Sequence, residues 1–329
     1  MRVLVTGASG MLGRKLVERL ALDGALAGEP LSALSLADAV EPVPPDAAFP
    51  VESVAADIAA RGAAADLLAS RPDVVFHLAA VVSGEAEADM DKGYRVNIDG
   101  MRLLLDAARA HAGAGYRPRL VFTSSIAVFG APLPDVIGDD ECPAPLTSYG
   151  TEKAVCELLL ADYSRRGFVD GIALRLPTVC VRPGAPNRAA SGVFSNIIRE
   201  PLSGRHAVLP VADDVRHWFA SPRASVGFLV HAAGVSTTGL GARRALTMPG
   251  VSATVAEEID ALRKVAPGAE RLIVREPDEA VATIVAGWPE AFDTQRANAL
   301  GFTAEQDFDE IVRVFIEDEL GGRLAGGPG

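Results

Sequence analysis

The segment Arg2–Thr6 is a short apolar run, and it is followed by the closely spaced glycines Gly7, Gly10 and Gly13. Apolar residues at helical spacing then continue from Met11 to about Leu26. Glycines placed this way allow a tight turn and let backbone N–H groups approach a pyrophosphate at the positive end of a helix. The spacing is G-x-x-G-x-x-G rather than the commoner G-x-G-x-x-G, so we interpret it as a variant of the dinucleotide-binding turn. A purely structural turn is the alternative.

Apolar strands and amphipathic helices alternate along the first half of the chain. The expected strands are 2–6, 31–37, 51–55, 73–78, 119–123 and 172–176, and the expected helices are 11–26, 59–70, 90–112 and 149–166. This alternation requires right-handed crossovers and predicts a doubly wound parallel sheet, the α/β Rossmann fold. The pattern loosens after Pro177, where shorter elements predict a smaller C-terminal α/β lobe.

These elements suggest a division of the chain into two domains and a tail. We expect the dinucleotide-binding Rossmann domain at 1–176, with a return segment at about 213–247. The substrate lobe is expected at 177–212 and 248–320, and its last helix, 308–320, has an apolar face. The glycine-rich end, 321–329, has no core residues and is expected to be flexible.

Residues at the ends of the expected strands have the chemistry of a dinucleotide site. Asp38 ends the second strand, and a carboxylate there accepts the ribose hydroxyls and repels a 2′-phosphate, so NAD is expected rather than NADP. The alternative is that Asp38 only caps a loop. Asp57 and Ile58, after the third strand, are candidates for the adenine edge. The small residues Ala79 and Ala80, after the fourth, would let a cofactor pass closely.

Tyr149 and Lys153 are four residues apart in an expected helix, so their side chains share one face of it. The ammonium stabilises the phenolate and lowers the pKa of the tyrosine toward neutral pH. A phenol of this kind can act as a general base or acid. Beside a dinucleotide site, the pair predicts hydride transfer at a carbon that carries a hydroxyl group.

Five motifs in the first 180 residues together resemble the extended short-chain dehydrogenase/reductases, the NAD-dependent epimerase/dehydratase superfamily. They are Thr6–Gly13, His77–Ala80, Asn97, Thr123–Gly130 and Tyr149-x-x-x-Lys153. The resemblance implies that Ser125 is the catalytic serine, Tyr149 the proton-transfer residue and Lys153 its partner. The further cofactor contacts that follow from it are Ser9, Met11, Leu12, Leu78, Asn97, Pro177 and Val179. In this arrangement Ser125 hydrogen-bonds the reacting oxygen, and Lys153 also holds the nicotinamide ribose.

The second half departs from the nucleotide-sugar enzymes of this superfamily, because Thr178 and Arg182 replace their usual asparagine and glycine. It resembles instead the D-erythronate dehydrogenases, a branch of the same superfamily, in the segments Arg182–Asn187, Ile198–Leu202, Val215–Trp218, Thr247–Ser252 and Gly287–Pro289. This resemblance implies NAD-dependent oxidation of the C2 hydroxyl of a four-carbon sugar acid.

A small carboxylate favours a bidentate arginine, so Arg182 and Arg216 are candidates to bind the substrate. A salt bridge is the alternative for each of them. Ser83, Asn187 and Trp218 are further substrate candidates, and Trp218 is equally a candidate core residue.

Composition limits the possible partners. The 329-residue chain has a net charge of −12 and no basic stripe, which argues against nucleic acid. Three cysteines match no metal or redox spacing and predict reduced thiols in a cytoplasmic protein, and the five histidines indicate no metal site. No signal peptide or membrane span is expected. The resemblance implies a homodimer in which helices 90–112 and 149–166 form a four-helix bundle.

Three functions remain open on the sequence. The first is a dehydrogenase of a small hydroxy acid, with D-erythronate preferred, which releases NADH. The second is an epimerase or dehydratase of nucleotide-diphosphate sugars, although Ile126 and Ala127 stand where dehydratases commonly carry an acidic residue. The third is a catalytically silent NAD-sensing protein, against which the presence of both Tyr149 and Lys153 counts.

Overall fold

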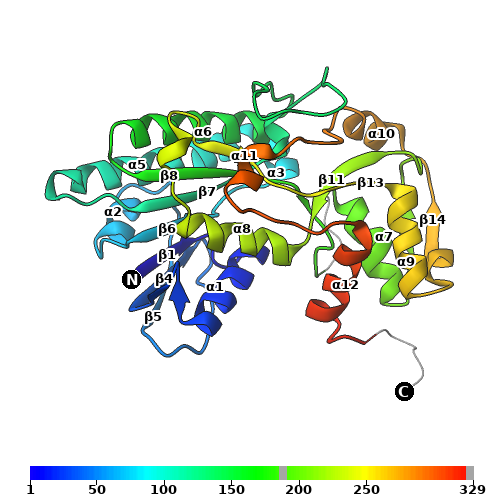
Figure 1. Cartoon of the computed structure of the whole chain (residues 1–329), viewed down its shortest axis with the longest axis horizontal. Coiled ribbons are helices and arrows are strands. Elements are labelled where there is room, and N and C mark those ends of the chain that lie inside the picture. Colours follow the sequence, from blue (N-terminus) through cyan, green and yellow to red (C-terminus); the bar gives the residue numbers. More distant parts are fainter. Residues whose placement is uncertain (185–190, 324–329) are drawn as a thin grey trace. The chain divides into compact units, whose positions relative to one another are not determined.

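Seven parallel strands form one sheet with the order β12–β8–β7–β6–β1–β4–β5 (Figure 1). They are β1 (Arg2–Thr6), β4 (Ala33–Asp38), β5 (Val51–Ala55), β6 (Val74–His77), β7 (Arg119–Ser125), β8 (Asp170–Leu176) and β12 (Ala245–Thr247). The sheet confirms the predicted doubly wound α/β fold. Its order reverses between β1 and β6, and folds of this kind bind ligands at the carboxyl ends of the strands beside such a reversal.

The computed structural model describes residues 1–184 and 191–323, which divide into two units. Unit 1 comprises 1–128, 143–175 and 226–247, and unit 2 comprises 129–142, 176–225 and the residues from 248 onward. The division differs from the expected one mainly in two segments, and unit 2 also includes Leu176 and residues 321–323. The segment 129–142 belongs to unit 2, where Ile137 forms a bridge with Phe292. Within the expected return segment, 213–225 also belongs to unit 2. Of the expected tail, 324–329 lies outside the described residues.

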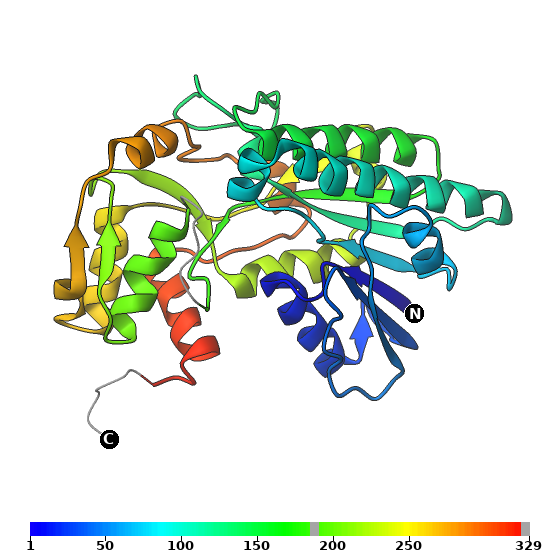
Figure 2. The same ribbon diagram turned by 180° about the vertical axis from the view of Figure 1, so that it is seen from behind.

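Helices cover both faces of the seven-stranded sheet, with α2, α5 and α6 on one face and α1 and α8 on the other (Figures 1 and 2). Val75, Leu104, Leu120 and Leu160 are fully buried beneath the first group. The remaining elements of unit 1 are α1 (Met11–Asp23), β2 (Ala25–Leu26), β3 (Glu29–Pro30), α2 (Ala63–Leu68), α3 (Ser83–Ala88), α4 (Met90–Gly93), η1 (Tyr94–Asp99), α5 (Gly100–His111), η2 (Ala112–Ala114), η3 (Ile126–Val128), α6 (Ser148–Arg165) and η4 (Thr238–Leu240). The helix α8 (Pro222–Gly234) belongs to unit 1 from Val226 onward.

The predicted helix over 90–112 is interrupted. Between α4 and α5, the segment η1 is a π-helix, a wider turn that is frequent at functional sites. Asn97 lies within η1 and is 3% exposed, because the wider turn directs its side chain into the interior. The predicted first helix also ends early, at Asp23, where Gly24 adopts a left-handed conformation with a φ of 62°.

Unit 2 contains the small sheets β13–β11–β9 and β10–β14. Its elements are β9 (Thr178–Val179), α7 (Gly192–Leu202), β10 (Ala207–Leu209), β11 (Arg216–Ala220), β13 (Val251–Thr254), α9 (Val255–Val265), η5 (Ala269–Leu272), β14 (Ile273–Arg275), α10 (Glu279–Val285), α11 (Gln295–Ala299) and α12 (Phe308–Glu319). Phe194, Phe219, Leu262 and Ile311 form the centre of a separate core. Nowhere in 1–184 or 191–323 is a helix both long and apolar enough to cross a bilayer.

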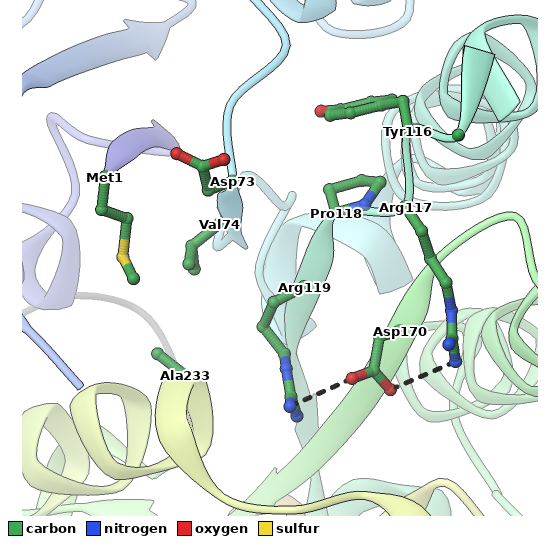
Figure 3. A pocket seen from close by; sticks show the side chains of 10 residues that line it. Met1, Asp73, Val74, Tyr116, Arg117, Pro118, Arg119, Asp170 and Ala233 are labelled. Carbon is green, nitrogen blue, oxygen red and sulfur yellow. Dashed lines mark ion pairs between the residues drawn. The ribbon is translucent and has the colours of Figure 1, made fainter. Parts of the chain in front are cut away.

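A cavity of about 450 Å³ lies at the amino ends of β1, β6, β7 and β8 (Figure 3). One carboxylate there, Asp170, faces three guanidinium groups: Arg119 at 3.0 Å, Arg244 at 3.1 Å and Arg117 at 3.8 Å. These ion pairs connect β7 and β8 with the residue before β12. The cavity is at the amino edge of the sheet, whereas the predicted cofactor residues of unit 1 follow the carboxyl ends of its strands.

Glu258 on α9 is completely buried in unit 2, and neither of its carboxylate oxygens has a hydrogen-bond partner among the described residues. Burial raises the pKa of this carboxyl well above its usual value of 4.5. The folded protein therefore keeps a proton on Glu258 that the unfolded chain releases once the pH rises above 4.5. Stability is lost as the pH increases from that value toward the raised pKa.

We expect Glu258→Met to stabilise the protein, since it replaces a buried, unpaired carboxyl with an apolar chain of similar length. The gain should grow between about pH 5 and pH 8 and reach about 1–3 kcal/mol in urea unfolding. As a control, Asp260→Asn on the exposed side of the same helix should change stability by less than about 1 kcal/mol. A gain that is the same at both pH values would contradict the explanation.

Candidate active site

The glycine turn packs against the segment that follows β6. Gly7 has a φ of +77°, and a Cβ there would lie 2.5 Å from the backbone nitrogen of Ala79. A Cβ on Gly13 would lie 2.1 Å from the carbonyl oxygen of Gly7. Both positions require glycine, because main-chain atoms already fill the space. The N-cap of α1 is Gly10, which has no side chain to bond the first N–H groups, and the first turn has no acidic residue. This helix end therefore favours an anion.

Asp38 lies beside the glycine turn. Its Oδ2 accepts a hydrogen bond from the backbone N–H of Ser9 at 2.8 Å, and its Oδ1 accepts one from Ala39 at 2.7 Å. The hydroxyl of Ser9 donates to the carbonyl oxygen of Val40 at 2.9 Å. These bonds hold the carboxylate of Asp38 next to the turn, where a ribose can reach it. The other two predicted turn residues, Met11 and Leu12, are partly exposed at the start of α1.

Asp57 and Ile58 point in different directions. The carboxylate of Asp57 is exposed and pairs with Arg95 at 2.6 Å. Burial acts to raise the pKa of Asp57, but the hydrogen bond and charge of Arg95 outweigh it and lower that pKa. The side chain of Ile58 is 5% exposed and packs against Gly100, where a Cβ would lie 2.8 Å from Ile58 Cγ2. Only the backbone of Ile58 is therefore left for a ligand.

The segment after β6 is held by Asn97. The side-chain oxygen of Asn97 accepts from the N–H of Val81 at 2.8 Å, and its nitrogen donates to the carbonyl oxygen of Val81 at 3.0 Å. The intervening residues Leu78, Ala79 and Ala80 are partly exposed, and Ser83 begins α3 two residues after Val81. Asn97 thus acts through the backbone of this segment.

Gly150 allows the start of α6 to contact the turn after β7. A Cβ on Gly150 would lie 2.1 Å from the carbonyl oxygen of Ala127 and 2.9 Å from Cβ of Pro145. This contact brings the chain at Tyr149 to the turn that begins at Ser125. The Oγ of Ser125 accepts a hydrogen bond from the N–H of Ala127 at 3.1 Å, which leaves its hydroxyl hydrogen to donate elsewhere. Both side chains are partly exposed.

Lys153 is almost completely buried, with 2% of its surface exposed. Its Nζ donates to the carbonyl oxygen of Thr123 at 2.8 Å and lies 5.4 Å from the ring centroid of Tyr149. Burial lowers the pKa of Lys153 to about 8, although nearby acidic groups oppose that change. At neutral pH the ammonium is therefore charged and close enough to stabilise a phenolate at Tyr149.

The arginines predicted to bind substrate lie in unit 2, and each has partners there. The Nε of Arg182 donates to the carbonyl oxygen of Val179 at 3.0 Å, and Nη2 donates to Ser191 Oγ at 3.2 Å. The Nη1 of Arg216 donates to the carbonyl oxygen of Ser252 at 3.2 Å and lies 3.4 Å from a carboxylate oxygen of Glu257. Both arginines are partly exposed.

The other predicted residues of unit 2 are mostly buried. Trp218 is 8% exposed and its indole N–H donates to the carbonyl oxygen of Met248 at 3.2 Å. Pro177 is buried and Val179 is 8% exposed on β9. Asn187 lies outside the described residues. Trp218 therefore packs within unit 2, and its backbone belongs to β11.

A family model described as "NAD dependent epimerase/dehydratase family" matches residues 3–220. The chain belongs to this family. It is 47% identical to D-erythronate dehydrogenase of Cupriavidus necator over 323 residues, which cover 97% of this chain and 98% of that one. It is 39% identical to D-erythronate dehydrogenase of Haemophilus influenzae over 321 residues, covering 97% and 100% of the two chains.

A solved structure is also similar to this family member over nearly its whole length. The crystal structure of the nucleoside-diphosphate-sugar epimerase from Agrobacterium tumefaciens superposes with a TM-score of 0.97 at 58% identity, covering 99% of this chain and 96% of that one. The family and the relatives make the chain an NAD-dependent dehydrogenase, whose cofactor is NAD.

The geometry of unit 1 fits NAD. The glycine turn has no room for a Cβ at Gly7 or Gly13. Gly10 leaves the first N–H groups of α1 without a side-chain cap. Asp38 is held next to these N–H groups, where it can accept the adenosine ribose hydroxyls. These residues would hold the adenosine half and the pyrophosphate.

Three residues that shape this site were not predicted as part of it. Gly150 was seen only as part of the tyrosine motif, Thr123 contributes a main-chain oxygen, and Glu152 bonds Asn97 from α6. The first could have been suspected from its place beside Tyr149. Thr123 and Glu152 depend on which distant groups the fold brings together, and the sequence carries no signal for that.

We expect Asp38→Ala to weaken NAD binding by about 10-fold or more, because charge-assisted hydrogen bonds contribute about 1.5–3 kcal/mol. NADP should lose much less affinity, since the same change removes the repulsion of its 2′-phosphate. Calorimetric titration of both nucleotides measures this. Asp23→Asn, at the exposed end of α1, serves as the control and should leave both affinities unchanged. Equal losses for NAD and NADP would contradict the role of Asp38.

Proposed function

We propose that the chain oxidises the C2 hydroxyl of a small sugar acid with NAD, and that its substrate is D-erythronate, which becomes 2-dehydro-D-erythronate. The observation that supports this most strongly is the similarity to two D-erythronate dehydrogenases, which extends over 97% of the chain. Similarity of that extent includes unit 2 as well as the NAD-binding residues of unit 1.

In the proposed reaction Tyr149 is the general base. NAD, when bound, would supply the acceptor for the hydride of the C2 carbon. Tyr149, as the phenolate, takes the proton of the C2 hydroxyl while the C–O bond becomes a carbonyl. Ser125 donates a hydrogen bond to the same oxygen and so fixes its position. Lys153 keeps the phenol acidic because its buried ammonium lies 5.4 Å from the Tyr149 ring centroid.

We propose that an arginine of unit 2 binds the substrate carboxylate, and Arg182 and Arg216 are the candidates. A planar guanidinium matches a carboxylate in a bidentate way. Arg216 pairs with Glu257, whose side chain is 55% exposed, and this pair is easily exchanged for a substrate carboxylate. We also propose that Ser83 of unit 1 and Trp218 of unit 2 contact the substrate.

Tyr149→Phe should lower turnover of D-erythronate by about 100-fold or more while leaving NAD affinity within about 2-fold of the parent. The measurement is NADH absorbance with a panel of four- to six-carbon aldonic acids, tested with NAD and with NADP. The matched control is Tyr163→Phe on the same helix, whose hydroxyl donates to Asp106, and it should keep its turnover. Full activity of Tyr149→Phe would refute the assignment.

A nucleotide-diphosphate-sugar epimerase is the second candidate, favoured by the name of the Agrobacterium tumefaciens structure at 58% identity. Such an enzyme uses the same tyrosine but returns the hydride to its substrate. Product analysis with a nucleotide sugar distinguishes the two, because epimerisation gives a new sugar without net NADH, whereas dehydrogenation of a free acid accumulates NADH.

We also propose a homodimer through α5 and α6. Leu158 on α6 is 73% exposed, and Leu103, Val155 and Leu159 are partly exposed on the same two helices. Apolar surface of this kind is typical of a two-fold interface between identical chains. Leu104, by contrast, is fully buried in the core.

Leu158→Glu should shift a dimer of the parent chain to monomers, because it places a charge in the centre of an apolar interface. Light scattering at several protein concentrations measures the mass. Leu22→Glu, at a leucine that is 84% exposed on α1, should leave the dimer intact. A parent chain that is monomeric at all concentrations would contradict the proposal.

We place the enzyme in the cytoplasm. Cys142, Cys156 and Cys180 are all free thiols, and two of them are buried. Unpaired cysteines are typical of reducing compartments.

A further inference from the structure

Glu152 is a buried carboxylate on the same helix as Tyr149 and Lys153. It stands on α6 beside Lys153 and is 0% exposed. Its Oε2 accepts a hydrogen bond from the side-chain nitrogen of Asn97 at 2.5 Å. Its Oε1 has no hydrogen-bond partner within 1–184 and 191–323. A buried carboxylate in this state is costly unless a nearby positive charge compensates for it.

The fold makes a space for this carboxylate. A Cβ on Gly93, at the end of α4, would lie 2.3 Å from Oε1 of Glu152 and 3.2 Å from the Cβ of Ala86. The π-helical segment η1 follows immediately and turns Asn97 inward to meet Oε2. Asn97 in the π-helical turn thus meets Oε2 of Glu152, and the missing side chain of Gly93 leaves space for Oε1.

The buried positive charge next to Glu152 in α6 is the ammonium of Lys153. The other buried carboxylate of α6, Glu157, is already matched by Arg175, with guanidinium nitrogens at 2.9 and 2.7 Å from its two oxygens. Glu157 also accepts from the hydroxyl of Ser124 at 2.6 Å. Glu152 has no such arginine among the described residues, and its negative charge acts on the ammonium of Lys153, the next residue of α6.

The remaining titratable groups near the ammonium do not supply a negative charge. His77 on β6 is buried and its pKa is lowered to about 3, first by burial and then by Lys153, so it is neutral. Burial raises the pKa of the Cys156 thiol to about 12, so it is neutral as well. Burial raises the pKa of Glu152, and Asn97 and Lys153 oppose that rise, whereas Glu87 on α3 adds to it.

We propose that Glu152 is a positioning residue that keeps Lys153 protonated, with its carboxylate fixed by Asn97 as the counter-charge of the buried ammonium. The inference rests on the roles of Tyr149 and Lys153 in the proposed function. Without this counter-charge, Lys153 loses its proton at a lower pH, and the phenol of Tyr149 loses the positive charge that makes it acidic.

Glu152→Gln tests this, because glutamine keeps the size of the side chain and an oxygen that accepts from Asn97, but has no charge. NAD affinity of the full chain is titrated between about pH 6 and pH 10, a range that includes the pKa of about 8 for Lys153. We expect affinity to match the parent at low pH and to be lost at a midpoint about one pH unit lower. That shift makes binding about 10-fold weaker above the parent midpoint.

Two matched variants complete the experiment. Glu152→Asp restores the charge and should bring the midpoint back toward that of the parent. Asp162→Asn removes a half-exposed carboxylate that pairs with Arg165 on the same helix, and should leave the midpoint unchanged. Where a sugar acid is oxidised, the alkaline limb of the turnover profile should move with the NAD midpoint.

An unchanged midpoint in Glu152→Gln would overturn the inference, and so would a loss of affinity that is equal at every pH, which is the result of a merely structural role. A parent chain whose NAD affinity does not depend on pH would overturn it too. Because NAD binding needs no sugar acid, failure of the proposed substrate shows in the turnover panel alone and does not alter this result.

Discussion

The site of unit 1 depends on backbone contacts that leave no room for a side chain. Gly7 meets the main chain at Ala79, Gly13 meets Gly7, and Gly150 meets the carbonyl oxygen of Ala127. The first contact fixes the turn after β1 against the segment after β6, and the second packs the start of α1 against that turn. The third fixes the start of α6 against the turn after β7. A methyl group at any of these positions would separate elements that carry the residues of the proposed reaction, so the geometry of the site depends on packing between main chains.

Lys153 is buried at this site, and a buried ammonium stays charged only if its surroundings compensate for the lost water. Lys153 has exchanged water for one carbonyl oxygen, that of Thr123, and for the face of the Phe122 ring at 4.8 Å. Burial alone would favour the neutral amine, and a neutral amine cannot acidify Tyr149. We infer that the negative charge on the same helix that compensates for this ammonium is that of Glu152. The Glu152 carboxylate bonds Asn97, whereas the Lys153 ammonium bonds the carbonyl oxygen of Thr123. Asn97 joins this charge pair to the backbone of Val81, so the electrostatics and the shape of the cofactor segment depend on the same amide.

The sequence was sufficient for the features that depend on local spacing. Tyr149 and Lys153 at i and i+4, the strand–glycine–helix unit, and Asp38 at a strand end each follow from chain geometry, and the doubly wound parallel sheet follows from the alternation of strands and helices. The features that were missed depend on contacts between distant segments. The π-helix at Tyr94–Asp99 forms where Asn97 meets Val81 and Glu152, and no local pattern of 90–112 indicates it. Likewise Arg216–Ala220 groups with unit 2, where it pairs with the short strands β13 and β9, whereas the expected return segment put it with the dinucleotide-binding domain.

Thr178, one of the positions at which the chain departs from the nucleotide-sugar enzymes, belongs to a connected set of side chains inside unit 2. Thr178 Oγ1 and His217 Nε2 are 2.7 Å apart, and Nδ1 of His217 lies 2.9 Å from the carbonyl oxygen of Pro289. Burial lowers the pKa of His217 to about 4, so the ring is neutral, and it stacks on Phe194 at 5.3 Å between centroids. Replacing Thr178 with asparagine would change the group that meets the buried ring of His217 and would disturb this hydrogen bond. Under the proposed function, unit 1 therefore supplies the hydride-transfer chemistry, while the choice of a small acid depends on residues of unit 2 that contact one another.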